Sequence, residues 1–302
     1  MKKFEGILLC TDFDGTIAEK AKISDENRAA VKYFTDNGGS FTIISGRKQI
    51  FFTRPSDLPK LTAPAVCLNG AMIIDGDKKI SEITMEPYDI CEAINFFKDN
   101  TILRRILIYN DLRVTKLIRH TNGYAYAFID ENDVTSDEIR VDNISADIVD
   151  GKFVKGIADV DEALSKGIYK AVATSTAKYC AEEDMIRIEN EIIKKVGDKI
   201  CICRSWPYGI EFLHKNATKG TAVKLLKEYT GAYLSVAIGN YENDTPMIRD
   251  ADIGVAVGDS SPDAIEAADV ITVNCNEHAV ADLIYNRLDS IIEAYKNTQK
   301  AD

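Results

Sequence analysis

Short apolar runs alternate with amphipathic segments along the first part of the chain. Residues 7–11 are apolar up to a final threonine, which is typical of a strand buried on both faces of a parallel sheet. Residues 25–37 have the periodicity of an amphipathic helix, and Ser24 is placed to cap it. Residues 40–44 and 65–68 predict two further strands. This order is typical of βα units, so we predict an α/β fold.

The pattern changes in the middle of the chain and then returns. Between residues 85 and 205, predicted helices at residues 88–100, 159–166 and 181–196 are mixed with alternating, β-rich runs, which predicts a separate α+β domain. After Pro207 the alternation resumes, with predicted strands at residues 209–213, 234–238, 253–257 and 270–273. The simplest organisation is a discontinuous Rossmann-like core with a parallel sheet. Residues 1–84 and 206–302 form this core, and residues 85–205 are inserted into it.

The composition restricts the partners that this chain can have. A net charge of −11 and an isoelectric point near 4.9 oppose binding to nucleic acids or anionic membranes, because both repel an acidic protein. Charged residues interrupt each hydrophobic stretch before membrane length, and we expect no signal peptide. The seven cysteines are scattered and only Cys201 and Cys203 are close in sequence, so we expect reduced thiols in a cytoplasmic protein. No feature indicates an obligate protein partner.

Two carboxylates directly follow the first predicted strand. Asp12 and Asp14 share one side-chain parity at its carboxyl end, and Gly15 allows a sharp turn out of the sheet. In open α/β sheets this edge carries the active site, and such a pair can hold a hard cation and attack a phosphorus atom. A bare Asp-x-Asp is more often a polar turn, so the pair alone does not establish this chemistry.

Polar residues at four other points support the same interpretation. Ser45-Gly46-Arg47 and Asn69-Gly70 follow the second and third predicted strands, and Lys219 stands at the start of a helix that Thr218 can cap. An Asn- and Asp-rich loop at residues 239–244 follows a later strand. Each feature is ordinary alone, but their order along the chain is hard to attribute to chance.

The ordered motifs resemble those of haloacid dehalogenase superfamily phosphatases, in the Cof-like (type IIB) branch with a large cap between the second and third motifs. The resemblance covers nearly the whole chain and is specific for the superfamily. It rests on residues 12–16, 44–47, 68–71, 218–220, 239–247 and 254–258. It implies a Rossmann-like core and an α+β cap that is mobile or roofs the site.

The resemblance implies a role for each of four residues. Asp12 is the expected nucleophile, which attacks the phosphoryl group and forms an aspartyl-phosphate. Asp14 is the expected acid and base, which protonates the leaving oxygen and then accepts a proton from water. Ser45 donates a hydrogen bond to the phosphoryl oxygens, and Lys219 neutralises negative charge. Further residues expected to contact phosphate or substrate are Gly46, Arg47, Asn69, Gly70 and Asn243.

The resemblance also implies an Mg²⁺ cofactor, held by oxygen ligands near the phosphate. The expected metal-site residues are Asp12, Asp14 through its carbonyl, Asn240 and Asp244, of which Asp244 holds either Lys219 or a metal-bound water. Asn240 is a departure, because the family usually has Asp there and a neutral amide oxygen replaces a charged one. This exchange predicts weaker metal binding rather than a different reaction.

We therefore expect a cytoplasmic, Mg²⁺-dependent phosphatase that acts on a small phosphorylated metabolite such as a sugar phosphate. Two alternatives remain open. A phosphomutase or phosphotransferase uses the same aspartyl-phosphate but has to shield it from water, and the sequence shows no sign of that. Asn240 suggests a weakly active protein that binds phosphorylated metabolites, although the retention of Asp12, Asp14, Ser45 and Lys219 argues against it.

Overall fold

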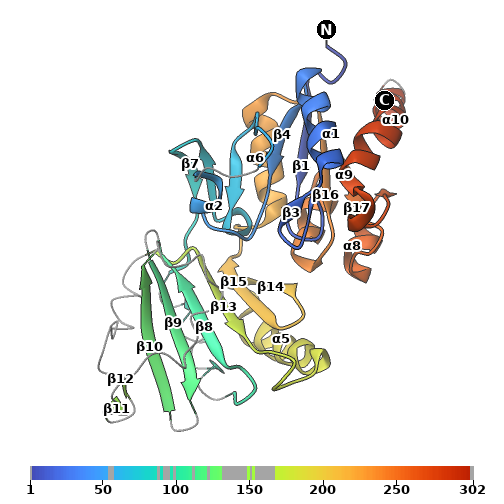
Figure 1. Ribbon diagram of the computed structural model, residues 1–302. Coiled ribbons are helices and arrows are strands. Elements are labelled where there is room, and N and C mark those ends of the chain that lie inside the picture. Colours follow the sequence, from blue (N-terminus) through green and yellow to red (C-terminus); the bar gives the residue numbers. More distant parts are fainter. Residues whose placement is uncertain are drawn as a thin grey trace. The chain divides into compact units, whose positions relative to one another are not determined.

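The computed structural model describes residues 2–53, 58–86, 89–90, 96–97, 100–110, 113–120, 123–130, 148–149, 152–153 and 167–299. The chain is divided into two units (Figure 1). The first unit combines Met1–Glu82 with Ala217–Asp302, and the second contains Ile83–Asn216. Among the described residues, no helix is both long and apolar enough to cross a lipid bilayer.

A parallel sheet of five strands forms the centre of the first unit, in the order β18-β17-β16-β1-β4. The strands are β1 (Ile7–Thr11), β4 (Ser40–Ile43), β16 (Leu234–Gly239), β17 (Ile253–Ala256) and β18 (Val270–Ile271). Every residue of β1 and β16 is buried, as apolar runs predict for strands covered on both faces. The predicted α/β core with a parallel sheet is confirmed.

Helices cover both faces of this sheet. They are α1 (Asp25–Asp36), α2 (Ile50–Thr53), α6 (Lys219–Thr230), α7 (Thr245–Asp250), α8 (Pro262–Ala267), α9 (Ala279–Asp282) and α10 (Leu288–Thr298). Short 3₁₀ turns occupy Leu68–Gly70, Glu242–Asp244 and Cys275–Glu277, and a π-helical turn occupies Leu283–Arg287.

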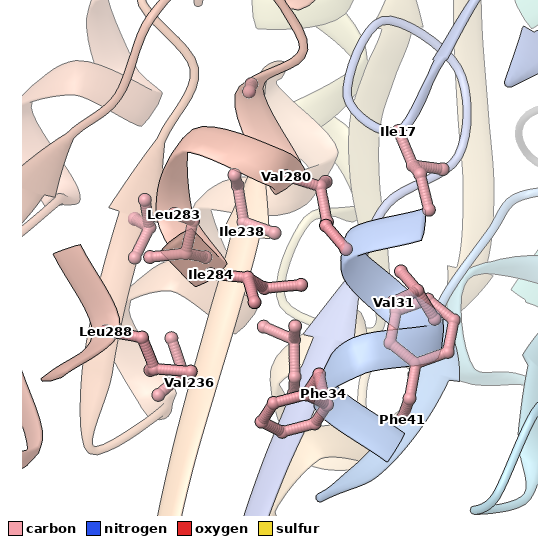
Figure 2. Close-up of a cluster of buried hydrophobic side chains, with 14 of the residues drawn as sticks. Ile17, Val31, Phe34, Phe41, Val236, Ile238, Val280, Leu283, Ile284 and Leu288 are labelled. Atoms are coloured by element: carbon pink, nitrogen blue, oxygen red, sulfur yellow. The ribbon is translucent and has the colours of Figure 1, made fainter. Parts of the chain in front are cut away.

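Alternate residues of β1 contact two different hydrophobic clusters, because side chains alternate between the faces of a strand. Ile7 and Leu9 belong to a cluster with α1, α9 and α10, whereas Leu8 and Cys10 belong to a cluster with α6, α7 and α8. Figure 2 shows the first cluster, where side chains from α1, the C-terminal helices and β16 converge. They include Val31, Phe34, Val236, Ile238, Val280 and Ile284.

Hydroxyl caps determine where two helices begin. The Ser24 hydroxyl accepts a hydrogen bond from the Asn27 N–H at 3.2 Å and caps α1. The Thr218 hydroxyl accepts one from the Thr221 N–H at 3.1 Å and caps α6. The local sequence therefore makes Lys219 the first residue of α6.

The run at residues 65–68 predicts a strand of the parallel sheet, and this prediction is wrong. β5 (Ala65–Cys67) lies in a separate antiparallel sheet with β6 (Met72–Asp75) and β7 (Lys78–Glu82). A parallel bridge between Ile44 and Val66 joins β5 to the end of β4. The reason is the tight turn at Leu68–Gly70, which folds the chain back so that β6 pairs with β5. A short hairpin of β2 (Ala18–Glu19) and β3 (Lys22–Ile23) follows β1.

The second unit contains a six-stranded antiparallel sheet in the order β10-β9-β8-β13-β15-β14. Its strands are β8 (Arg105–Tyr109), β9 (Arg113–His120), β10 (Gly123–Asp130), β13 (Lys170–Thr174), β14 (Ile200–Trp206) and β15 (Gly209–His214), and a small pair is formed by β11 (Ile148–Val149) and β12 (Lys152–Phe153). Helix α5 (Glu182–Val196) packs on one face through Met185, Ile188 and Ile192. The helix predicted at residues 159–166, and most of the one at 88–100, lie outside the described residues.

The strand at residues 209–213, predicted for the core, belongs instead to the second unit. β15 pairs with β13 from Lys170 opposite Leu213 to Thr174 opposite Gly209, and it also pairs with β14. The boundary between the units therefore falls after Asn216 rather than after residue 205. A short apolar strand has the same pattern in either sheet, so the sequence does not show which partner it takes. The role of the second unit as a cap stays a prediction.

Candidate active site

Asp12 extends the line of β1 at the carboxyl edge of the sheet. Its N–H donates to the carbonyl of Ile238 at 2.9 Å, so hydrogen bonding to β16 continues to this residue. The chain then turns at Gly15, which has a φ of 78° and donates its N–H to the Ala18 carbonyl at 2.9 Å. Asp12 is buried, whereas Asp14 in the turn is exposed. The two carboxylates therefore have different environments.

The Lys219 ammonium is fully buried between two carboxylates. Its Nζ lies 2.6 Å from Asp12 Oδ1 and 2.5 Å from Asp244 Oδ1. Because α6 begins at Lys219, the Thr218 cap fixes the backbone that carries this side chain. The structure thus brings together one predicted residue from the start of the chain and two from its last third.

These three groups change one another's protonation. Burial alone lowers the pKa of Lys219, but the carboxylates of Asp12 and Asp244 outweigh burial and raise that pKa above its ordinary value. Burial and the charge of Asp244 raise the pKa of Asp12 to about 7, against the opposite effect of Lys219. Lys219 is therefore a permanent ammonium. When both carboxylates are ionised, the buried cluster carries one excess negative charge.

Asp244 is predicted as a metal-site residue, but its oxygen atoms bind other groups. Oδ1 accepts from Lys219, and Oδ2 accepts the N–H groups of Asn240 at 2.8 Å and Tyr241 at 3.0 Å. In this structure Asp244 orients Lys219 and fixes the loop after β16, and its assignment as a metal-site residue stays a prediction. Of the two roles that the sequence left open for Asp244, the structure shows the contact with Lys219.

Ser45 follows the end of β4 and is buried. Its N–H donates to the carbonyl of Val66 at 3.0 Å, and its hydroxyl oxygen accepts the N–H of Arg47 at 3.2 Å. Gly46 forms the bend between these two residues. The hydroxyl hydrogen of Ser45 has no acceptor in the described part of the chain, so it is available for a ligand.

Arg47 binds Asp14 in a two-pronged ion pair. Its Nε lies 2.9 Å from Asp14 Oδ2, and its Nη2 lies 2.8 Å from Asp14 Oδ1. The guanidinium carbon also lies 4.9 Å from the ring centre of Phe13 and 4.7 Å from that of Phe51. Arg47, predicted to contact substrate, therefore has an internal partner in this structure. Sequence reasoning missed the two aromatic rings, and only their proximity to the motifs could have indicated them.

The segment Leu68–Gly70 joins three of the predicted motifs. Leu68, Asn69 and Gly70 all have positive φ, at 52°, 58° and 105°, which is rare for a bulky residue such as leucine. The Asn69 N–H donates to the Ser45 carbonyl at 3.0 Å, and its side-chain oxygen accepts the Asn243 amide at 3.3 Å. A Cβ at Gly70 would lie 2.4 Å from the Thr218 carbonyl. Asn69, Gly70 and Asn243 therefore connect the Ser45 loop, the start of α6 and the last motif.

Asn240 lies against the turn that follows Asp14. Its Oδ1 accepts the Thr16 hydroxyl at 3.1 Å, and a Cβ at Gly15 would lie 2.5 Å from its Nδ2. The sequence assigns no role to Thr16, although Thr16 lies within the first motif. The structure thus places the unusual amide against Gly15 and Thr16, in the turn that follows Asp14, and the resemblance expects a metal ligand at this residue.

The oxygen atoms near this turn suit a hard cation. Asp12 Oδ2 and the Asp14 carbonyl have no hydrogen-bond donor among the described residues, and the Asn240 amide supplies a third oxygen. Mg²⁺ prefers such oxygen ligands and keeps several waters, so this small set fits it. No group of three or more His, Cys, Asp and Glu side chains is arranged for a metal in the described ranges. The fit therefore depends on a carbonyl and an amide as well as on Asp12.

Comparison with known proteins identifies the family. The haloacid dehalogenase-like hydrolase family matches residues 9–284, so the chain belongs to this family of hydrolases. A Haemophilus influenzae protein named as a candidate phosphatase is 28% identical over 275 residues, which cover 90% of this chain and 94% of that protein. A Bacillus subtilis 5-amino-6-(5-phospho-D-ribitylamino)uracil phosphatase is 26% identical over 282 residues, which cover 92% of this chain and 94% of that protein.

Solved structures agree with this assignment at the level of the fold. A haloacid dehalogenase-like hydrolase from Bacillus subtilis superimposes with a TM-score of 0.67 at 20% identity, covering 92% of this chain and 99% of that one. A sugar phosphatase of subclass IIB superimposes with a TM-score of 0.65 at 19% identity, covering 92% and 97%. The resemblance found from the motifs is thereby confirmed.

Proposed function

We propose that the protein is a phosphatase that hydrolyses the phosphate ester of a small metabolite, with Asp12 as nucleophile and Mg²⁺ as cofactor. The observation that carries this proposal is the buried Lys219 ammonium between Asp12 and Asp244. It holds one oxygen of Asp12 and leaves the other without a hydrogen-bond donor among the described residues. A carboxylate oriented in this way can attack phosphorus in line, and the adjacent positive charge stabilises the transferring group.

The proposed reaction has two steps. First, an oxygen of Asp12 bonds to phosphorus while the bond from phosphorus to the ester oxygen breaks, and Asp14 gives a proton to that oxygen. Second, a water oxygen attacks the aspartyl-phosphate as Asp14 takes a proton from the water, and this releases phosphate and restores Asp12. Ser45 donates its hydroxyl hydrogen to a phosphoryl oxygen, and Lys219 stays on Asp12.

Arg47 has to change partner during this cycle. It binds both oxygens of Asp14 in the structure, so Asp14 can exchange a proton with substrate only after Arg47 releases at least one of them. A second anionic group on a substrate competes for the same guanidinium. We propose that substrate binding moves Arg47 away from Asp14. The contact between Arg47 and substrate that the sequence predicts then forms only after this exchange of partners.

Mg²⁺ is proposed to bind the Asp12 carboxylate, the Asp14 carbonyl and the Asn240 amide oxygen, with phosphate and water completing the shell. When bound, the ion neutralises charge on the phosphoryl oxygens. Asp244 acts on the same site through Lys219 and the loop that carries Asn240.

The proposed substrate class is a sugar phosphate or a related phosphorylated polyol. Two comparisons support it: one relative is named for a phosphoribityl compound, and one structural neighbour is a sugar phosphatase. Asn240 favours a second candidate, a weakly active protein that mainly binds phosphorylated metabolites, because it removes a charge from the metal site. A phosphotransferase remains the third, and it passes the phosphoryl group to an alcohol instead of water.

A phosphate-release screen over sugar, polyol and nucleotide phosphates tests the proposal, with Mg²⁺ and with EDTA. We expect release on some esters that requires Mg²⁺ and is lost in Asp12→Asn. Asp77→Asn is the matched control, because Asp77 is exposed in the turn between β6 and β7. Ester binding in calorimetry without release supports the binding protein, and a new phosphate ester formed from an added alcohol supports the phosphotransferase. Wild-type turnover by Asp12→Asn contradicts the mechanism.

A further inference from the structure

Two thiols lie in one row on an edge strand of the second unit, and neither belongs to the candidate active-site residues described above. β14 pairs only with β15 in the described sheet (Figure 1). Ile200 and Ile202 contact the hydrophobic cluster that includes α5, so the alternate residues Cys201 and Cys203 face the opposite side of the sheet. Both cysteines are half-buried and free of disulfides.

The strand is regular where it carries these thiols. Cys201 lies opposite Leu213 and Cys203 opposite Glu211, and the register shifts only between Arg204 and Trp206. Cys201 and Cys203 are two residues apart on a regular strand, so their Cα atoms are about 6.7 Å from each other. That separation is near the upper limit for a disulfide, at roughly 6.8 Å, so a direct S–S bond requires a change in the strand. A single atom that bridges the two sulfurs does not require such a change in the strand.

The surroundings of the pair favour a cation. The two neighbouring thiols act on each other, which lowers the pKa of the Cys201 thiol and raises that of Cys203, and burial raises the pKa of Cys203 further. Glu211, opposite Cys203, disfavours a second thiolate through its negative charge, and its own carboxylate is paired with Lys170 at 2.5 Å. A divalent cation bound to both sulfurs neutralises the two thiolates and removes this repulsion.

We propose that Cys201 and Cys203 form a two-thiolate binding site for a soft divalent cation of the cadmium and mercury class. Two sulfur–metal bonds form, both thiol protons pass to solvent, and no electrons are transferred. Thiolate sulfur is a ligand for soft ions, whereas the oxygen atoms around Asp12 suit hard ones. The two sites therefore bind different metals, and this proposal does not rest on the proposed phosphatase activity.

Calorimetric titration of the full chain with Cd²⁺, in excess Mg²⁺ and in buffers of different ionisation enthalpy, tests the site. We expect one tight Cd²⁺ per chain and the release of up to about two protons. Cys201→Ser and Cys203→Ser should each weaken binding by about 100-fold or more, because a second ligand on the same strand acts at high effective concentration. Cys180→Ser, which removes a half-buried cysteine elsewhere in the unit, is the control and should bind as tightly as wild type.

A second measurement does not depend on the folding of a variant. Alkylation of the native wild-type protein, followed by peptide mass analysis, should show that Cd²⁺ protects Cys201 and Cys203 together, while Cys180 reacts at its usual rate. Protection of neither thiol overturns the proposal. So does tight binding that persists when both cysteines are replaced by serine.

Discussion

Replacement of Asp12 by asparagine should stabilise the metal-free protein while it removes catalysis. In the wild type, Asp12 and Asp244 share the Lys219 ammonium in a buried site, so two negative charges face one positive charge. Asparagine keeps the shape of the side chain and an oxygen that can accept from Lys219. It leaves a one-to-one pair of Lys219 and Asp244. The burial cost of one carboxylate and its repulsion with the other then disappear.

The size of this stabilisation follows from the shift in the pKa of Asp12. Its pKa rises from 3.8 to about 7, and each unit corresponds to about 1.4 kcal/mol, so the ionised form lowers the free energy of unfolding by at most about 4–5 kcal/mol. Water that enters the site and small shifts of Lys219 screen the charge, so we expect about 1–3 kcal/mol. Because the folded state binds the proton more tightly, this destabilisation is absent below pH 4, grows between pH 4 and 7, and is complete above pH 7.

Urea unfolding in EDTA at pH 5 and pH 8 measures this effect. Asp12→Asn should exceed the wild type in free energy of unfolding at pH 8, and the difference should become smaller at pH 5. Asp77→Asn should follow the wild type at both values. Added Mg²⁺ should then stabilise the wild type more than Asp12→Asn, because the ion binds the charged carboxylate. If Asp12→Asn is less stable than the wild type at pH 8, or the difference does not change with pH, the account of the buried charges is refuted.

Four further predictions concern other parts of the first unit. Asp14→Asn should slow hydrolysis of alkyl phosphates more than that of aryl phosphates, since good leaving groups need less protonation; equal losses in steady-state kinetics would exclude Asp14 as the acid. Gly70→Ala should lower the free energy of unfolding by about 2–4 kcal/mol in urea titrations, because its Cβ meets the Thr218 carbonyl and φ is 105°. Burial raises the pKa of Asp252, but hydrogen bonds from Lys227 and Ser235 outweigh burial and lower it. Asp252→Asn should therefore lose about 1–3 kcal/mol at pH 7 and less as pH falls below about 4. Asn240→Asp should bind Mg²⁺ about tenfold more tightly in calorimetry without substrate.

The sequence indicated which residues meet at the edge of the sheet, because strand ends and helix starts can be predicted from apolar runs and caps. Asp12, Asp14 and Lys219 are placed in this way. The partners of each side chain could not be predicted, because they depend on rotamers and on neighbours that are distant in sequence. Arg47, for example, pairs with Asp14, which lies 33 positions earlier in the chain.

Backbone geometry limits sequence-based prediction in the same way. The apolar run at Ala65–Cys67 looks like a strand in any sheet, and the turn at Leu68–Gly70 decides its partner. Positive φ at Leu68 is unfavourable locally and has no sequence signal. It persists because the contacts of this turn with Ser45, Asn243 and Thr218 fix it from three sides.

The residue at position 240 and the charge of the buried cluster of Asp12, Lys219 and Asp244 both affect two properties, the affinity for Mg²⁺ and the stability of the metal-free protein. In the metal-free protein above pH 7, Asp12 and Asp244 already exceed Lys219 by one negative charge. An aspartate at position 240 lies against the same turn and adds a further negative charge, whereas the amide keeps the contact with the Thr16 hydroxyl without it. Asn240→Asp should therefore bind Mg²⁺ more tightly and also unfold at lower urea in EDTA. A variant that gains affinity with no loss of metal-free stability would show that the amide does not relieve repulsion among the carboxylates.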